Sequence, residues 1–175
     1  MPGSPAHLFS RFLDVATAPR LNASEKGAVE SWLTPEAAEL FFSQDDPDQR
    51  HGYHAALTVI AAGVKDSDVV MAALLHDVGK RHARLGLLGR SLASLLILSG
   101  LPLPERVRMY GDHGLVAARE LGELSVPSLV IDFALHHHGK RPPTIEPETW
   151  DLLVSADRAP KASSALFARI TSRSR

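Results

Sequence analysis

The chain has 175 residues, of which 45% are apolar and 22% charged, the balance of a soluble globular protein with a substantial hydrophobic core. Its formal net charge is −1, and acidic and basic residues are interspersed, which argues against a dedicated nucleic-acid-binding protein with a basic face. The absence of cysteine excludes disulfide scaffolds, zinc sites built on cysteine and thiol catalysis.

The chain opens with an arm rather than a structural element. Residues 1–20 show no apolar signal core, and together with the absence of cysteine this leads us to expect a cytoplasmic protein. We expect this arm to be flexible and the domain to cover residues 21–175, with its core at 49–160. In LTPEAAELFF, Thr34 predicts a helix N-cap and Pro35 the first helical position.

Two further helices are predicted before residue 80. After the polar stretch SQDDPDQR, Asp48 can cap a helix over residues 49–62, which Gly63 would end. The segment DSDVVMAALLHDVGK begins with capping residues and predicts a helix over residues 67–77, stopped by Gly79. This helix is apolar until it reaches a histidine and an aspartate, an ionisable pair that is costly to bury unless it is paired or binds a metal.

The next segment, residues 85–104, is unusually apolar. RSLASLLILSG within it predicts a helix ended by Gly100. We interpret it as a core or interface helix, and a lid over the site or a membrane-surface patch are the alternatives. Its uncharged run, residues 91–104, has 14 residues with two prolines, whereas a membrane-spanning helix needs roughly 20 apolar residues, so no transmembrane segment is predicted.

The C-terminal half is also helical by pattern. PERVRMYGDHGLVAARELGEL predicts one or two helices, with His113 near the start of the second. VPSLVIDFALHHHG has the β-branched composition of a strand, but nothing nearby could pair with it as a hairpin, so we predict a helix. KRPPTIEP is a loop, ETWDLLVSADRA a helix, and the tail from Lys161 is helical or frayed. The whole pattern predicts a single all-α domain of about seven helices.

Side chains that can bind a metal lie at the ends or on the buried sides of these predicted helices. They are His51, His76, Asp77, His113, His136, His137, His138 and Asp157. Helix bundles build metal sites from side chains on facing helices, so these residues can converge on one cavity.

The order H…HD…D, with HD closing an apolar helix and followed by VGK, resembles the HD-domain metal-dependent phosphohydrolases. The resemblance spans residues 49–157 and implies that a divalent metal is held by His51, His76, Asp77 and Asp157. It also implies that Asp77 bridges the ions where two metals bind. DHGLVAARELGEL and LHHHG are similar to the family's further ligand segments, which would add His113 and His136 or His137 at a second ion.

Some positions leave alternatives. We prefer His51 as the first ligand because it follows the polar cap directly, although His54 lies one turn later and could replace it. His138 stands where related dinuclear enzymes often have an acidic residue, so we expect it to contribute less to metal binding. No glycine-tyrosine-proline signature follows, which disfavours the subgroup that degrades cyclic-di-GMP.

The implied chemistry is hydrolysis of a phosphate ester. Imidazole and carboxylate ligands suit Mn, Fe, Co, Ni or Zn better than Mg alone, as one or two ions. Lys80 is placed to hold a substrate phosphate, helped by Arg81 and Arg84, unless it only offsets the negative end of the helix.

We therefore expect a metal-dependent phosphohydrolase acting on a small phosphate ester of the nucleotide class, in which Asp77 and a metal-bound water carry the attack. One alternative is a non-catalytic metal- or nucleotide-binding regulatory domain of the same fold. Another is a metal-dependent hydrolase of a different ester class. The expected partner is the small phosphorylated substrate, and the oligomeric state, a homodimer included, is left open.

Overall fold

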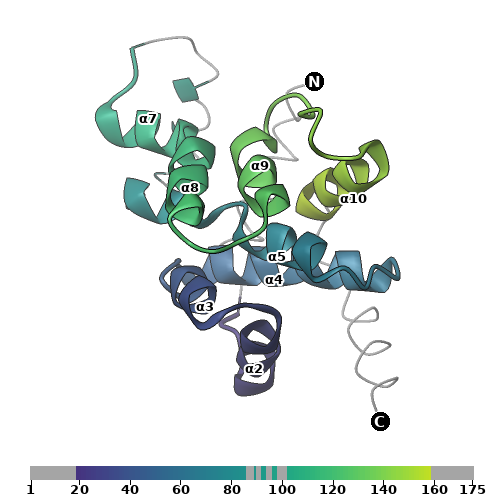
Figure 1. Ribbon diagram of the computed structural model, residues 1–175. Helices are drawn as coiled ribbons and strands as arrows, with labels where there is room; N and C mark the ends of the chain where they lie inside the picture. The colour runs from purple at the N-terminus through teal and green to yellow at the C-terminus, as the bar shows by residue number, and fades with distance from the viewer. Residues whose placement is uncertain (1–18, 86–88, 90–91, 94–95, 98–101, 159–175) are drawn as a thin grey trace.

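The structure is a computed structural model that describes residues 19–85 and 102–158, with a few isolated residues between these ranges. All regular elements in the described ranges are helical, so the expected all-α fold is confirmed. Figure 1 shows α4 and α5 crossing the middle of the molecule, with α2 and α3 on one side and α8, α9 and α10 on the other. The elements in chain order are α2 (Ala23–Trp32), α3 (Pro35–Phe42), α4 (Asp46–Ala61), α5 (Ser67–Leu75), the 3₁₀ helix η1 (Val78–Ala83), α7 (Glu105–Gly111), α8 (His113–Gly122), α9 (Ser128–His136) and α10 (Pro147–Arg158).

Helix α5 is the centre of the hydrophobic core. Its residues from Val69 to Leu75 are all buried, so the helix is covered on every side rather than along one stripe. It packs against α4, α9 and α10, and α9 in turn packs against α8. Helix α5 therefore lies in the middle of the molecule, and the two ionisable residues that follow it, His76 and Asp77, are buried there as well.

Local capping explains where the first two helices begin. The Asn22 side chain accepts a hydrogen bond from the backbone N–H of Glu25 at 3.0 Å, and the Glu25 carboxylate accepts one from the Asn22 N–H at 2.8 Å. This reciprocal capping box starts α2, a helix that our sequence analysis did not predict. The predicted cap of α3 is present, since Thr34 Oγ1 accepts from the Ala37 N–H at 3.3 Å.

Two predicted boundaries are wrong. Helix α4 begins at Asp46 with Asp45 as its N-cap, so Asp48 is a buried residue inside the helix and not its cap. Pro47 explains the earlier start, because its fixed φ angle suits the first helical turn. Helix α5 ends at Leu75, where the chain tightens into η1 instead of continuing to residue 77.

The C-terminal half follows the sequence pattern more closely. PERVRMYGDHGLVAARELGEL forms two helices, with His113 as the first residue of α8. The strand-like segment from residue 128 forms α9, and its buried Phe133 packs edge-on against Trp150 of α10, with ring centroids 5.7 Å apart. Residues 1–18 of the predicted arm, most of the predicted helix within 85–104 and the tail from Lys161 lie outside the described residues.

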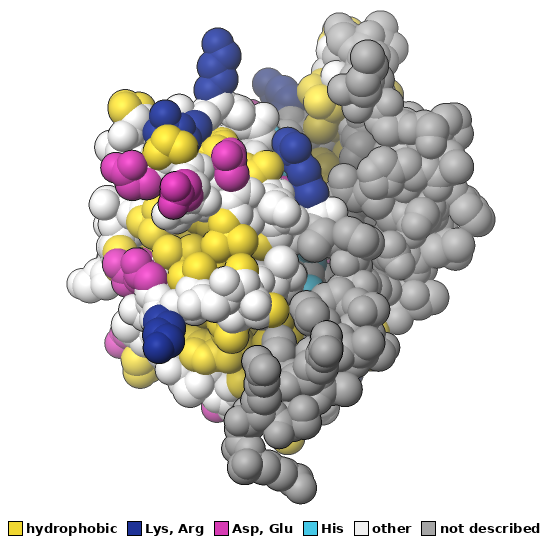
Figure 2. Space-filling model, turned by 90° about the vertical axis from the view of Figure 1, so that its right-hand side faces the viewer, with side chains coloured by type: hydrophobic (Ala, Val, Ile, Leu, Met, Phe, Trp, Pro, Cys, Tyr) yellow, Lys and Arg dark blue, Asp and Glu magenta, His cyan; other side chains and the backbone are white. Residues whose placement is uncertain are grey.

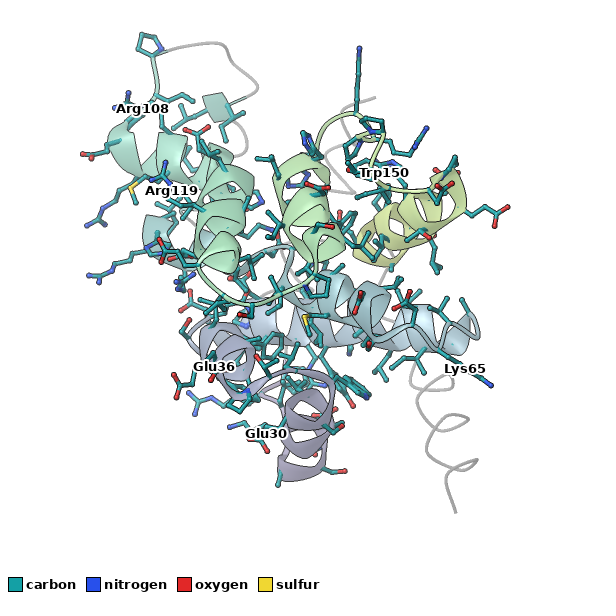
Figure 3. The ribbon with its side chains drawn as sticks, in the orientation of Figure 1. Glu30, Glu36, Lys65, Arg108, Arg119 and Trp150 are labelled. Atoms are coloured by element: carbon teal, nitrogen blue, oxygen red, sulfur yellow. The ribbon has the colours of Figure 1, made fainter. Side chains whose placement is uncertain are left out.

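Several charged side chains project from the outside of the bundle. In Figure 3, Glu36, Lys65, Arg108 and Arg119 point away from the body of the molecule. The face drawn in Figure 2 carries a broad band of apolar side chains beside acidic ones and almost no histidine surface. Among the candidate ligands, the side chains of His76, His113 and His137 are buried.

No helix in the described part of the chain combines the length and the apolar character that crossing a bilayer requires.

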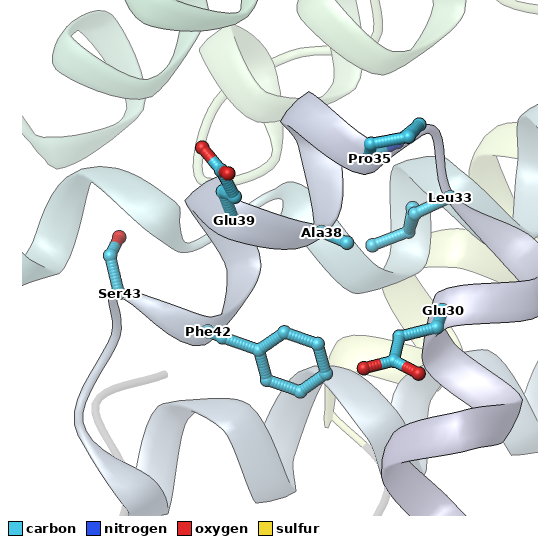
Figure 4. A pocket seen from close by; sticks show the side chains of 7 residues that line it. All are labelled: Glu30, Leu33, Pro35, Ala38, Glu39, Phe42 and Ser43. Atoms are coloured by element: carbon cyan, nitrogen blue, oxygen red, sulfur yellow. The ribbon is translucent and has the colours of Figure 1, made fainter.

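A groove of about 710 Å³ lies between α2 and α3. Figure 4 shows Phe42 and Glu30 facing each other across it, with Leu33 and Ala38 at its side. None of the candidate metal ligands lines this groove, so it is separate from the site described below.

A buried ion pair joins α2 to α4. The Arg50 guanidinium donates two hydrogen bonds to the Glu25 carboxylate, at 2.6 and 2.8 Å, and others to the carbonyl oxygens of Arg20 and Pro19. The two paired side chains are 7% and 12% exposed, so water screens them little. Burial alone would raise the pKa of Glu25, but Arg50 outweighs it and lowers the pKa below the usual 4.5.

We expect Glu25→Gln to lower the free energy of unfolding by about 2 kcal/mol at pH 7, because it leaves Arg50 buried without its counter-charge. Since the pKa of Glu25 is lowered in the folded protein, the wild type holds this advantage above pH 4.5 and loses it as the pH falls further. Urea denaturation of both proteins between pH 7 and pH 3 measures the difference.

The control is Asp46→Asn, which removes a surface pair with Arg20, a side chain 84% exposed. This change should cost less than about 1 kcal/mol. A constant difference between wild type and Glu25→Gln across the pH range would contradict the ion-pair interpretation.

Candidate metal centre

Helix ends bring the candidate ligands together. His51 lies in the first half of α4, and His76 is the C-cap of α5, directly before Asp77. His113 begins α8 and His137 caps the C-terminus of α9. Asp157 lies in the last turn of α10. Because these helix ends meet around the buried end of α5, ligand-type side chains distant in sequence share one site.

Asp77 lies between two groups of imidazoles, and each of its carboxylate oxygens faces one group. Its Oδ2 is 3.4 Å from His76 Nε2 and 3.6 Å from His51 Nε2. Its Oδ1 is 3.2 Å from His113 Nε2 and 3.5 Å from His137 Nε2. A single buried carboxylate therefore belongs to both groups, as a residue that bridges two ions would.

Asp157 completes the first group. Its Oδ1 lies 3.0 Å from His51 Nε2 and 3.3 Å from His76 Nε2. Metal–ligand bonds of about 2.1 Å place neighbouring ligand atoms roughly 3.0–3.4 Å apart, so this spacing is close to that of ligands around one ion. The four residues His51, His76, Asp77 and Asp157 could hold a metal, and so could Asp77, His113, His137 and His138.

Backbone hydrogen bonds fix the tautomer of three of these imidazoles. The Nδ1 atoms of His76, His113 and His137 lie 3.0, 2.6 and 2.8 Å from the carbonyl oxygens of the residues three positions earlier. A carbonyl oxygen can only accept, so each Nδ1 carries the proton and donates it. In the neutral rings, each Nε2 then has a free lone pair directed at Asp77, which is the arrangement of metal-binding histidines.

The second group fits a cation on two observations. Asp77 Oδ1 is buried and makes no hydrogen bond within the described structure. The Nε2 atoms of His113 and His137, both acceptors in this tautomer, lie only 3.3 Å apart. Facing lone pairs repel, and a buried carboxylate oxygen without a donor is costly, so a positive ion among these atoms would satisfy all three.

The electrostatics keep the ligands in their metal-binding forms. Burial would raise the pKa of Asp77, but the neighbouring Lys80 ammonium and the His76 ring hold it well below its usual range. Burial opposes ionisation of Asp157 too, and a hydrogen bond from His51, together with the nearby His76 ring, lowers its pKa far below normal. Both carboxylates are therefore anions in the folded protein.

The histidine triplet divides by position. His137 is buried and faces Asp77, whereas His136, which the sequence offered equally, contributes no atom to either group. His138 is exposed but does contribute an atom to the second group, although we expected it to contribute less to metal binding than its neighbours. Desolvation, together with His137 and His113, lowers the pKa of His138 to about 3, so its ring stays neutral.

The other sequence-derived candidates also separate. His54 belongs to neither group, while His51 belongs to the first. Lys80 makes a close ion pair with Asp77, whose charge outweighs the effect of burial and raises the pKa of the ammonium. Arg81 instead makes two hydrogen bonds to Glu120, at 2.7 and 2.6 Å, so its guanidinium is engaged in holding η1 against α8.

We expect His137→Ala to lower the number of Mn²⁺ ions bound per chain by one while the first group keeps its ion. Its neighbour His136→Ala, the matched control, should leave the metal content unchanged because that ring faces neither group. Titration calorimetry with Mn²⁺ and elemental analysis of the dialysed proteins measure both. An equal loss in the two variants would contradict the assignment of ligands by helix position.

Comparison with protein-family models gives one family, the HD domain, whose model matches residues 50–173. Comparison with curated proteins gives no match, and neither does comparison with solved structures. The match covers most of the chain and contains the histidine-aspartate pair and every member of both groups of candidate ligands. This chain therefore belongs to the HD domain family.

Proposed function

We propose that this protein is a metal-dependent phosphohydrolase that acts on a small phosphate ester of the nucleotide class. The observation that carries the proposal is the position of Asp77, whose two oxygens face two separate groups of imidazole Nε2 atoms. Membership of the HD domain family supports it, because that family is one of metal-dependent phosphohydrolases.

The proposed ligands of the first ion are His51, His76, Asp77 and Asp157, and those of the second are Asp77, His113, His137 and His138. His136 was a candidate ligand from the sequence, but it belongs to neither of these proposed ligand sets. Imidazole mixed with carboxylate suits Mn, Fe, Co, Ni or Zn better than Mg alone. Two such ions would supply a nucleophile at neutral pH and would neutralise charge on a phosphate ester.

The chain's own residues would have separate tasks. Asp77 holds both groups in register, because each of its oxygens belongs to one of them. The backbone carbonyls that accept from the Nδ1 atoms keep the rings aligned. Lys80 provides a fixed positive charge beside Asp77, and its side chain is 15% exposed, so a substrate phosphate can reach it. We assign the catalytic roles to Asp77 and Lys80.

Turnover tests the proposal directly. The purified chain, screened against nucleotides and other phosphate esters with Mn²⁺, Co²⁺, Ni²⁺, Mg²⁺ or Zn²⁺, should release phosphate or a phosphorylated product from at least one substrate. EDTA should abolish this activity, and Mn²⁺ or Co²⁺ should restore it. Nucleotide binding without turnover under every metal would instead favour the regulatory-domain alternative, and release from only non-phosphate esters would favour the other hydrolase class.

We expect Lys80→Gln to raise KM about tenfold and to change kcat much less, because a charge that holds the phosphate in the ground state contributes uniform binding. Lys65→Gln is the control, since Lys65 points into solvent away from the site (Figure 3). Metal content is measured alongside, because Lys80 contacts Asp77. A fall in kcat alone would place Lys80 in the transition state, and unchanged kinetics would leave it only a role at the end of the helix.

A further inference from the structure

We propose that Gly52, Gly79 and Gly114 are positioning residues that set the distances between the ligand-bearing helices. Each glycine lies within two residues of a candidate ligand, and each lies where the backbone that carries the next ligand passes too close for a side chain. The inference rests on the proposed metal centre.

Gly52 lets α4 approach α5. It follows His51 directly, and a Cβ atom at this position would lie 2.7 Å from the carbonyl oxygen of Leu74 and 3.1 Å from Phe41 Cε2. Leu74 lies two residues before His76 on α5. The contact therefore controls the separation of His51 and His76, two members of the first group.

Gly79 lets η1 approach the start of α8. It lies two residues after Asp77, and a Cβ atom there would overlap the carbonyl oxygen of His113 and lie 2.9 Å from the backbone N of Ala117. His113 is itself a candidate ligand that faces Asp77 Oδ1. The absence of a side chain at Gly79 is thus what allows the carboxylate and this imidazole to meet.

Gly114 lets α8 approach α9. It follows His113, and a Cβ atom there would lie 2.7 Å from the carbonyl oxygen of Ala134 and 3.3 Å from that of Leu135. The Ala134 oxygen is the same atom that accepts the Nδ1 hydrogen of His137. A side chain at this position would therefore displace the acceptor that orients His137 as well as the helix that carries it.

The obstacle at each glycine is backbone, which cannot rotate away as a flexible side chain can. To reach even 3.0 Å, a distance below which Cβ contacts essentially do not occur, the backbones would have to separate by about 0.3 Å at Gly52 and Gly114 and by about 1 Å at Gly79. Metal–ligand distances hold to within about 0.2 Å, so a separation of that size exceeds what a metal site accepts. The cost of a methyl group at these glycines should fall on metal binding before it falls on the fold.

Other helical glycines do not share this environment. A Cβ atom at Gly27 on α2 or at Gly122 at the end of α8 would have no neighbour within 4 Å. Both glycines are distant in sequence from the candidate ligands. They are therefore matched controls for the same chemical change, and Gly122 is a control within the helix that contains Gly114.

The test is the number and affinity of Mn²⁺ ions in Gly→Ala variants of the full chain. Gly114→Ala and Gly79→Ala should lose the second ion, or bind it about 10–100-fold more weakly, and keep the first. Gly52→Ala should weaken the first ion by a similar factor. Titration calorimetry gives the affinities, and native mass spectrometry counts ions on the folded species even where that species is a minor fraction.

Two kinds of control separate positioning from general loss of stability. Gly27→Ala and Gly122→Ala should bind both ions as the wild type does. Val29→Ala, a buried residue of α2 away from the ligands, should lower the melting temperature without lowering the ion count. The ion count of each glycine variant is compared with that of Val29→Ala, provided that the two metal-free proteins have similar melting temperatures.

Each outcome decides the matter. The inference is overturned if all three site variants keep two ions at wild-type affinity, or if none of them gives a folded species, since the glycines would then serve the fold as a whole. A wild type that binds no metal would refute the proposed function first. A wild type that binds two ions without turnover, with ions lost in the glycine variants, would refute the proposed function and support the inference.

Discussion

The structure depends on one buried carboxylate. Asp77 is 2% exposed at the centre of the bundle, and a carboxylate buried there is stable only if positive charge or hydrogen-bond donors surround it. Lys80 supplies one positive charge, and imidazoles face both carboxylate oxygens of Asp77. Because α5 is apolar on every side and ends immediately before this residue, the packing of the core determines where the charged centre lies.

The partners of that carboxylate come from distant parts of the chain. His51 and Asp157 are separated by 106 positions in sequence, yet His51 Nε2 lies 3.0 Å from Asp157 Oδ1. Only the complete arrangement of α4, α5, α8, α9 and α10 brings all the groups together. The site is therefore a product of helix packing, and its dimensions depend on how closely the helix backbones approach one another.

Much of this could be predicted from the sequence, because the signals are local. Thr34 and Pro35 mark the start of α3, and the apolar run before His76 and Asp77 marks the central helix, although this helix ends at Leu75 and not at residue 77 as predicted. Helix α2 was missed although Asn22 and Glu25 form a recognisable capping box. The choice between His136 and His137 could not be made, since adjacent residues at a helix end point about 100° apart and the sequence does not fix that phase.

The hydrogen bonds that orient the ligands have a thermodynamic consequence. Each Nδ1 donates to a carbonyl three residues earlier on the same helix end, so ring orientation is set locally and requires no ion. A zinc finger, by contrast, gains its folded structure from the metal. Here little side-chain entropy remains to be lost when an ion arrives. Metal exchange at the proposed centre would therefore proceed within a folded scaffold, and the ion bound there would depend on relative affinity and supply rather than on the history of folding.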